Sequence, residues 1–269
     1  LCRKASINRI SLGLQSTVQQ ELDMLGRIHT YEEFLQSYQW AREAGFDNIN
    51  VDLMFAIPGQ TCESWKHNLE TVAELLPEHI SAYSLIIEEG TPFARKKLIL
   101  PTEDEEYQMY EDTAEILRKY GFHQYEISNY ARNGFECRHN KGYWQRTEYL
   151  GAGLGAASLF QGQRFSNTSD MKVYLSDSTD PEKIREDVTT LSGSNEMEEF
   201  MFLGLRKING VSEYDFYKSF RVSMDEIYKE SIENLIKEGL LVREEDRIRL
   251  TDRGIDLSNY ALSQFLLGE

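Results

Sequence analysis

Strand patterns and helix patterns alternate through the first half of this sequence, and the alternation limits the folds that it can adopt. The clearest unit is 48–61, where Ile, Val, Leu and Phe alternate with Asn, Asp and Met before a turn at Pro58-Gly59. Such alternation is typical of a strand with one buried face, and Thr61 can cap the helix that follows. Repeated strand–helix units form a parallel sheet with right-handed crossovers, either open or curled into a barrel.

The same unit recurs from residue 9 to about residue 130. The expected strands are 9–15, 48–55, 80–88 and 124–129, and the expected helices are 18–25, 31–44, 62–75 and 103–120. Thr30 and Thr102 each precede a glutamate by three residues, which is the capping-box pattern that begins a helix. Gln15, Asp52 and Ser84 fall on the polar faces of successive strands, so we expect them to line a cavity inside a curled sheet.

The alternation of strand and helix patterns stops after residue 130, and the sequence as a whole predicts three parts. Residues 1–130 form the β/α part, 131–192 form a looser connecting region, and 193–269 form a mostly helical C-terminal domain. In the last part, three expected helices precede a short hairpin around Glu244-Glu245-Asp246, an arrangement that resembles a winged helix. Winged helices often bind DNA, but the acidic residues of this wing disfavour that role.

The charge of the chain restricts its partners. Its 269 residues carry 45 Asp and Glu against 29 Lys and Arg, a net charge of -16, which repels phosphate backbones and anionic lipids. Cys2, Cys62 and Cys137 form no CxxC pair, as is usual in a reducing cytosol. No secretion signal or bilayer-length apolar run is visible. We therefore expect a cytoplasmic protein without a nucleic-acid partner or an integral membrane segment, and the start at Leu1 suggests a truncated or processed chain.

Two side chains of the β/α part have the chemistry of ligand contacts. Asp52 faces inward near the C-terminal end of its strand, where β/α proteins place ligands. The alternative for Asp52 is a carboxylate that is hydrogen-bonded to neighbouring backbone. Arg27 follows the strand that ends at Gln15, and its guanidinium can form a plain ion pair or clamp the carboxylate of a ligand.

The connecting region holds two further candidates. His139 lies in the segment His-Asn-Lys-Gly-Tyr-Trp. A loop histidine is usually solvated, but Tyr143 and Trp144 offer aromatic walls that suit a flat cofactor, so a metal or heme ligand is the alternative. Gly151–Gly155 has the spacing of a dinucleotide fingerprint, yet it follows the β/α repeats instead of opening the first one. These glycines more simply permit backbone to approach a ligand or another strand closely.

Several segments resemble, in order along the chain, the radical S-adenosylmethionine (SAM) proteins related to oxygen-independent coproporphyrinogen III oxidase. They are RISLGLQS at 9–16, GRIHT at 26–30, NINVDLM at 48–54, IPGQT at 57–61, HISAYSL at 79–85, YEISN at 125–129 and HNxxYW at 139–144. The HNxxYW element points to the heme-chaperone branch of this family, HemW. The resemblance covers nearly the whole chain.

The resemblance implies a fold and a set of cofactors. The fold is α/β: the second half of a partial (β/α)6 radical-SAM barrel, followed by a mostly helical, winged-helix-like C-terminal domain. The family's CxxxCxxC segment, which binds a [4Fe-4S] cluster, is absent, so the cluster ligands are expected outside this chain and enzymatic activity stays open. A half barrel leaves a strand edge open, which suggests a homodimer.

The resemblance also assigns residues to ligands. By motif position, Gln15, Arg27 and Asp52 contact SAM, and Ile86 and Ala157 line the same site. His139 becomes the axial ligand of heme iron, with Tyr143 beside it. The implied function is a heme chaperone that delivers heme to apo-hemoproteins. The alternative is oxygen-independent coproporphyrinogen III oxidase, which performs a radical oxidative decarboxylation in heme biosynthesis.

Overall fold

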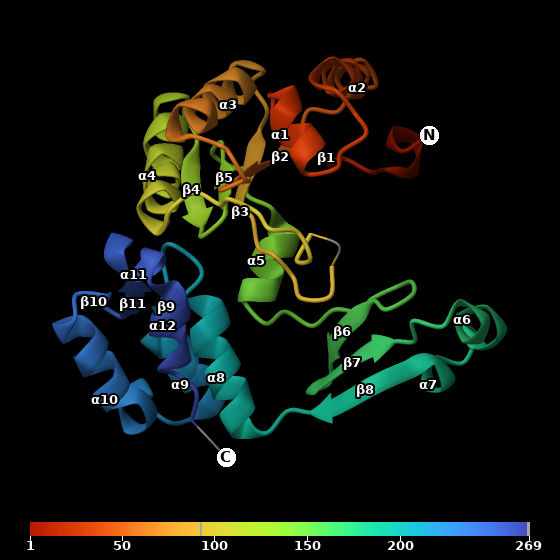
Figure 1. The fold of residues 1–269 in the computed structure, drawn as a ribbon. Helices are drawn as coiled ribbons and strands as arrows, with labels where there is room; N and C mark the ends of the chain where they lie inside the picture. The colour runs from red at the N-terminus through yellow and green to blue at the C-terminus, as the bar shows by residue number, and fades with distance from the viewer. Residues whose placement is uncertain (92, 268–269) are drawn as a thin grey trace. The chain divides into compact units, whose positions relative to one another are not determined.

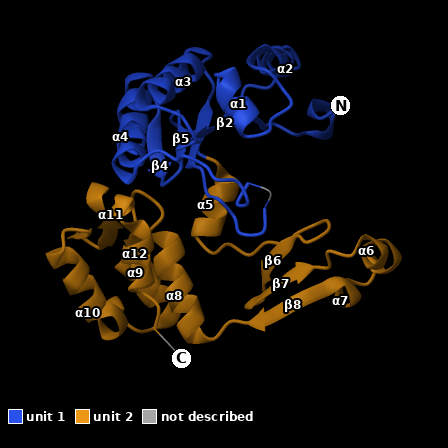
Figure 2. Ribbon diagram, viewed as in Figure 1, with its two compact units in different colours: residues 1–136 blue, residues 137–269 orange. Residues whose placement is uncertain are grey.

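The computed structural model describes residues 1–91 and 93–267, and their contacts divide the chain into two compact units. Unit 1 comprises residues 1–136 and unit 2 comprises residues 137–269 (Figure 2). The division into 1–130, 131–192 and 193–269 stays a prediction. Within the described residues, no helix combines the length and the apolar character that a membrane crossing requires.

Unit 1 is built on a five-stranded sheet with the order β1-β2-β3-β5-β4 (Figure 1). Its strands are β1 (Ile10–Gln15), β2 (Ile49–Phe55), β3 (His79–Ser84), β4 (His123–Glu126) and β5 (Asn129–Ala131). The first three strands are parallel, as expected, with Asp52 of β2 opposite Gly13 on one side and Ser81 on the other. The chain leaves β3 at Ser84, so the predicted strand at 80–88 is too long at its C-terminal end.

The sheet is not parallel throughout, and here the sequence prediction is wrong. The short strand β5 pairs antiparallel with both β3 and β4. Residues 127–128 alone join β4 to β5. A link of two residues can close a hairpin but cannot make the crossover that a parallel pair requires, so these strands must run in opposite directions.

The three longer helices of unit 1 that the structure describes begin where their capping residues predict. They are the 3-10 helix η1 (Arg3–Ala5), α1 (Gln19–Met24), α2 (Tyr31–Glu43), α3 (Cys62–Glu74) and α4 (Glu103–Lys119). Thr30 and Thr102 form the two capping boxes with Glu33 and Glu105, and both predictions are confirmed. The Thr61 side chain accepts a hydrogen bond from the backbone N–H of Ser64 and caps α3.

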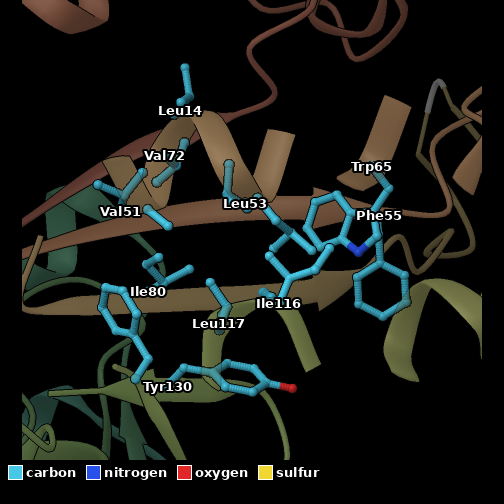
Figure 3. Close-up of a cluster of buried hydrophobic side chains, with 14 of the residues drawn as sticks. Leu14, Val51, Leu53, Phe55, Trp65, Val72, Ile80, Ile116, Leu117 and Tyr130 are labelled. Carbon is cyan, nitrogen blue, oxygen red and sulfur yellow. The ribbon is translucent and has the colours of Figure 1, made fainter. Parts of the chain in front are cut away.

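The core of unit 1 lies between the sheet and α2, α3 and α4. The alternating residues of β2 face it: Ile49, Val51 and Leu53 are fully buried among side chains from these helices (Figure 3). Trp65 of α3 adds a directional link, because its indole N–H donates to the Met109 carbonyl of α4 at 2.9 Å. Burial of one strand face under helices leaves the opposite face, which carries Asn50 and Asp52, for other contacts.

Unit 2 begins with α5 (Arg138–Trp144) and an antiparallel sheet, β6-β7-β8. Its strands are β6 (Ala157–Phe160), β7 (Gln163–Asn167) and β8 (Arg185–Thr190), and α6 (Met171–Asp177) and α7 (Pro181–Ile184) lie between β7 and β8 in the chain. The sequence predicts only a looser connection here. Phe165 is the one apolar residue of β7, and Val188 is the one apolar residue of the exposed strand β8, so neither sequence shows the apolar alternation that marks a half-buried strand.

The rest of unit 2 confirms the helical, winged-helix-like arrangement. Its elements are α8 (Gly193–Gly204), β9 (Val211–Ser212), α9 (Glu213–Phe220), α10 (Met224–Lys237), β10 (Leu241–Glu244), β11 (Arg247–Leu250), α11 (Asp252–Asp256) and α12 (Ser258–Ser263). The hairpin β10–β11 turns at Glu245 and Asp246, as predicted, and β9 pairs with its second strand. The large buried side chains Phe216, Tyr228 and Phe265 pack among the helices.

Candidate functional site

Polar side chains of neighbouring strands form a hydrogen-bonded row on the face of the unit 1 sheet that lies away from the core. Strand register sets this row, because Ser11 is paired with Asn50, and Asp52 with Ser81. Asp52 accepts from the Ser11 hydroxyl at 3.1 Å and from the Asn50 amide at 2.7 Å. The carboxylate is therefore held by side chains rather than by backbone, and it keeps acceptor capacity for a ligand.

His79 is the most deeply buried member of this row. Its Nδ1 lies 2.5 Å from the Asn50 side-chain oxygen, and its Nε2 lies 2.9 Å from the Tyr125 hydroxyl. Burial, together with the positive charge of Arg9, lowers the pKa of His79 from 6.5 to about 3. The imidazole is therefore neutral. Because an amide oxygen only accepts, Nδ1 carries the proton and Nε2 accepts from Tyr125.

The row continues across β3 to β5 and β4. Ser81 donates to the Asn129 side-chain oxygen at 2.6 Å, and the Asn129 amide donates to the buried carboxylate of Glu126. The sequence alone assigned no function to His79, Ser81 or Glu126. The signal for His79 and Ser81 was the polar alternation in HISAYS, which indicates a strand face that is buried yet not apolar.

Gln15 ends β1 in a backbone conformation that side chains rarely adopt. Its φ is +74°, and the pairing of β1 with β2 shifts register between Gly13 and Gln15. Gly13 leaves room for the glutamine, since a Cβ at residue 13 would lie 3.0 Å from Gln15 Nε2. Left-handed backbone at a residue other than glycine costs free energy and is common at ligand sites.

A buried carboxylate fixes the turn between β1 and α1. Glu21 Oε2 accepts from Ser16 Oγ at 2.6 Å, from Gln60 Nε2 at 2.9 Å and from Asn68 Nδ2 at 3.1 Å. The hydroxyl of Ser64 donates to the other oxygen. Glu21 thus joins the end of β1, the IPGQT turn and α3, and it positions the helix that leads to Arg27. The sequence analysis did not single out Glu21, because a lone glutamate in a short helix carries no pattern.

Arg27 and Ile86, which the resemblance assigns to one site, do lie together. They line a hollow of about 260 Å³ in unit 1, along with Met54, Glu88 and Phe93. Among the described residues, Arg27 forms no ion pair, and its side chain is exposed. Met54 is the next residue after Asp52 on the same strand face, so the polar row of β2 leads toward this hollow.

Ala157 belongs to unit 2, where it is the exposed first residue of β6. Its carbonyl oxygen would lie 2.3 Å from a Cβ at residue 151, so Gly151 permits a close backbone approach, as one alternative predicted. The glycine run leads into a strand and not into a helix, which removes the context of a dinucleotide fingerprint. The role of Ala157 at SAM stays a prediction.

His139 and Tyr143, the two predicted heme contacts, lie together on α5. Their rings meet edge to face with centroids 4.6 Å apart, and Tyr143 meets Tyr149 in the same way at 4.7 Å. His139 is exposed, and no hydrogen bond from the described part of the chain engages its ring nitrogens. An accessible imidazole beside two aromatic rings fits an iron-bound, flat ligand.

The described residues do not fit an iron–sulfur cluster. Among 1–91 and 93–267, no group of three or more His, Cys, Asp or Glu side chains is arranged to hold a metal ion. Cys2 is exposed, Cys62 is half-buried and Cys137 is buried.

Comparison with known proteins identifies the class of protein to which this chain belongs. Family models match as "Radical SAM superfamily" over residues 1–72 and as "HemN C-terminal domain" over residues 191–257. The fold is that of the coproporphyrinogen III oxidase HemN from Escherichia coli, with a TM-score of 0.82, 22% identity, and coverage of 98% of this chain and 65% of that one. Fold and family models together define a radical SAM protein with a HemN-type C-terminal domain.

Closer relatives narrow the assignment. The heme chaperone HemW of Lactococcus lactis is 40% identical over 269 residues, which cover 98% of this chain and 70% of the relative. HemW of Bacillus subtilis is 37% identical over 273 residues, covering 99% and 71%. The chain belongs to the HemW family. Membership of the radical SAM proteins implies SAM and an iron–sulfur cluster as cofactors.

Proposed function

We propose that this chain acts in a heme chaperone, which binds heme through His139 and delivers it to apo-hemoproteins in the cytoplasm. The observation that carries the proposal is the exposed His139 imidazole, set edge-on to Tyr143 on α5. The named function of the HemW relatives from Lactococcus lactis and Bacillus subtilis supports the same role.

His139 would be the axial ligand, and Tyr143 and Tyr149 would flank the porphyrin. Heme supplies an open coordination position on its iron, which a neutral imidazole fills. Because His139 lies on the surface of unit 2 and not in its core, an acceptor protein can displace it without unfolding the domain. Accessible binding of this kind suits transfer better than permanent retention.

Unit 1 would hold SAM. Arg27 can clamp its carboxylate, and Asp52 can accept from its ammonium or hydroxyl groups. Gln15 would donate or accept at the end of β1, and Ile86 would cover the apolar part of the ligand. The fit rests on the unpaired guanidinium of Arg27 in its hollow and on the partly engaged carboxylate of Asp52.

The rival function is oxygen-independent coproporphyrinogen III oxidase. The HemN-like fold favours it. An oxidase would turn over coproporphyrinogen III, whereas a chaperone would bind heme and leave porphyrinogen unchanged. Turnover of porphyrinogen by the protein would show that it is the oxidase.

A hemin titration followed at the Soret band tests the chaperone proposal. We expect saturable binding with an imidazole-ligated spectrum, and we expect His139→Ala to lose that spectrum. His67→Ala is the matched control, because His67 is an exposed histidine on α3 outside both sites. An unchanged spectrum in His139→Ala would assign the iron to another ligand.

A further inference from the structure

Unit 2 contains a basic pocket, although the chain as a whole is strongly acidic. The pocket has a volume of about 440 Å³ and lies among the C-terminal end of α5, α8, β9, α9 and β11. Its lining includes Trp144, Phe200 and the cations Arg146, Lys207, Lys218 and Arg247. Asp215 is the one carboxylate among the lining residues that the structure describes. In a chain of net charge -16, such a concentration of cations is unexpected.

The cations of this pocket are not equally available. Arg146 is neutralised, because it donates to Glu199 at 3.0 Å and to Glu196 at 3.2 Å. Arg247 donates instead to backbone carbonyls, of Asn209 at 2.7 Å and of Gly210 at 3.0 Å. These bonds fix the guanidinium in place without cancelling its charge.

Lys207 is the second cation of the pocket that forms no ion pair, although the charge of Asp215 offsets part of the repulsion from its neighbours by raising the pKa of Lys207. Burial and the neighbouring charge of Arg247 lower the pKa of its ammonium group below the usual 10.5. No carboxylate in the described part of the chain forms an ion pair with Lys207. Two cations held close together in a partly buried site repel each other, and a bound anion would relieve that repulsion.

The aromatic residues of the lining indicate which kind of anion the pocket would bind. Trp144 and Phe200 offer aromatic surface, and the indole N–H of Trp144 is buried without a hydrogen-bond partner. A buried donor of this kind is normally satisfied. A small hydrated anion gains little from aromatic surface, whereas an organic carboxylate with an apolar body uses the cations and the rings together.

We propose that this pocket is a carboxylate subsite for a porphyrin, in which Lys207 and Arg247 bind the propionate side chains of heme. The proposal rests on the proposed function and deepens it. Trp144, which lines the pocket, lies on the same helix as His139. Lys141, two residues after His139, is close enough to Lys207 for its charge to lower the pKa of the Lys207 ammonium group, so the pocket adjoins the helix that carries the proposed iron ligand.

Comparison of heme with heme dimethyl ester tests the subsite without any mutation, because esterification removes both carboxylate charges. We expect the wild-type chain to bind heme at least about tenfold more tightly than the ester in the same detergent. Lys207→Met should erase most of that preference while the imidazole-ligated Soret spectrum persists. Lys237→Met, at the exposed end of α10, is the charge-matched control and should change nothing.

The outcomes separate this subsite from the proposed function. Equal affinities for heme and its ester, with no effect of Lys207→Met, would overturn the subsite even if His139→Ala abolished iron ligation. Metal-free protoporphyrin IX tests the subsite without iron ligation, because it has the propionates and no iron. Lys207-dependent binding of protoporphyrin IX, together with a heme spectrum that is insensitive to His139→Ala, would support the subsite and refute ligation by His139.

Discussion

The candidate sites of the two units hold their polar groups in different ways. In unit 1, Asn50 bonds to His79 and to Asp52, and Glu21 bonds to Gln60, so these side chains belong to closed networks. In unit 2, the imidazole of His139, the ammonium of Lys207 and the indole N–H of Trp144 have no hydrogen-bond partner among the described residues. A closed network fixes the shape of a site before the ligand arrives, whereas open donors gain their partners only from the ligand. Unit 1 therefore resembles a preformed cofactor site, and unit 2 a site for temporary binding.

Removal of a closed network should have the largest effect on stability. Glu21→Ala leaves the donors of Ser16, Gln60, Ser64 and Asn68 without their acceptor in a buried place. We expect the free energy of unfolding to fall by about 3 kcal/mol or more. Urea denaturation measures the change. Glu70→Ala, an exposed glutamate on α3, is the control and should stay within roughly 0.5 kcal/mol of wild type. Equal losses in both variants would mean that the network does not stabilise unit 1.

The buried histidine of unit 1 allows its network to be tested with pH. The pKa of His79 is lowered from 6.5 to about 3, so the unfolded chain binds the proton more readily than the folded chain does. The stability that neutral His79 contributes is complete above pH 6.5 and is lost as the pH falls toward 3. In that window we expect a slope of about 1.4 kcal/mol per pH unit from this group.

Variants isolate that slope from other titrating groups. His79→Gln should remove its contribution and leave a shallower slope. Urea midpoints collected between pH 4 and pH 7 compare the variant with wild type. If His79→Gln kept the wild-type slope, the buried imidazole would not be the source of the pH dependence.

Much of unit 1 follows from local sequence signals. The alternation in β2 and the capping boxes at Thr30 and Thr102 predict real elements, because each depends on contacts within a few residues. The reversal of β5 was not predicted. Its three residues are too few to show a period, and its direction is set by the hairpin with β4. The sheet of unit 2 was missed for a similar reason, since β7 and β8 each contain a single apolar residue and therefore show no period.

The residues of the candidate sites also differ in whether the local sequence points to them. Asp52 and Gln15 are candidates from the sequence because each is a polar residue near the end of an apolar strand, and their contact with SAM stays a prediction. Glu21 and Lys207 could not be predicted, because their importance arises from partners or neighbours far away in sequence, namely Asn68 for Glu21 and Arg247 for Lys207. When a charged residue depends on contacts with residues far away in the chain, the sequence around it does not show that dependence.

The smallest expected effect concerns backbone strain, which both units contain. Gln15 of unit 1 and Arg221 of unit 2 adopt left-handed φ values of +74° and +60°. Replacement of either by glycine should stabilise its unit by roughly 0.5–1 kcal/mol, since glycine takes this conformation without a steric penalty. The two positions should differ in function. Arg221 ends α9 as an ordinary helix cap, so Arg221→Gly should leave ligand binding intact. Gln15→Gly should weaken SAM binding about fivefold or more in calorimetry, because it removes an amide from the site. If Gln15→Gly raised stability and left SAM affinity unchanged, the strain at the end of β1 would have no part in holding the cofactor.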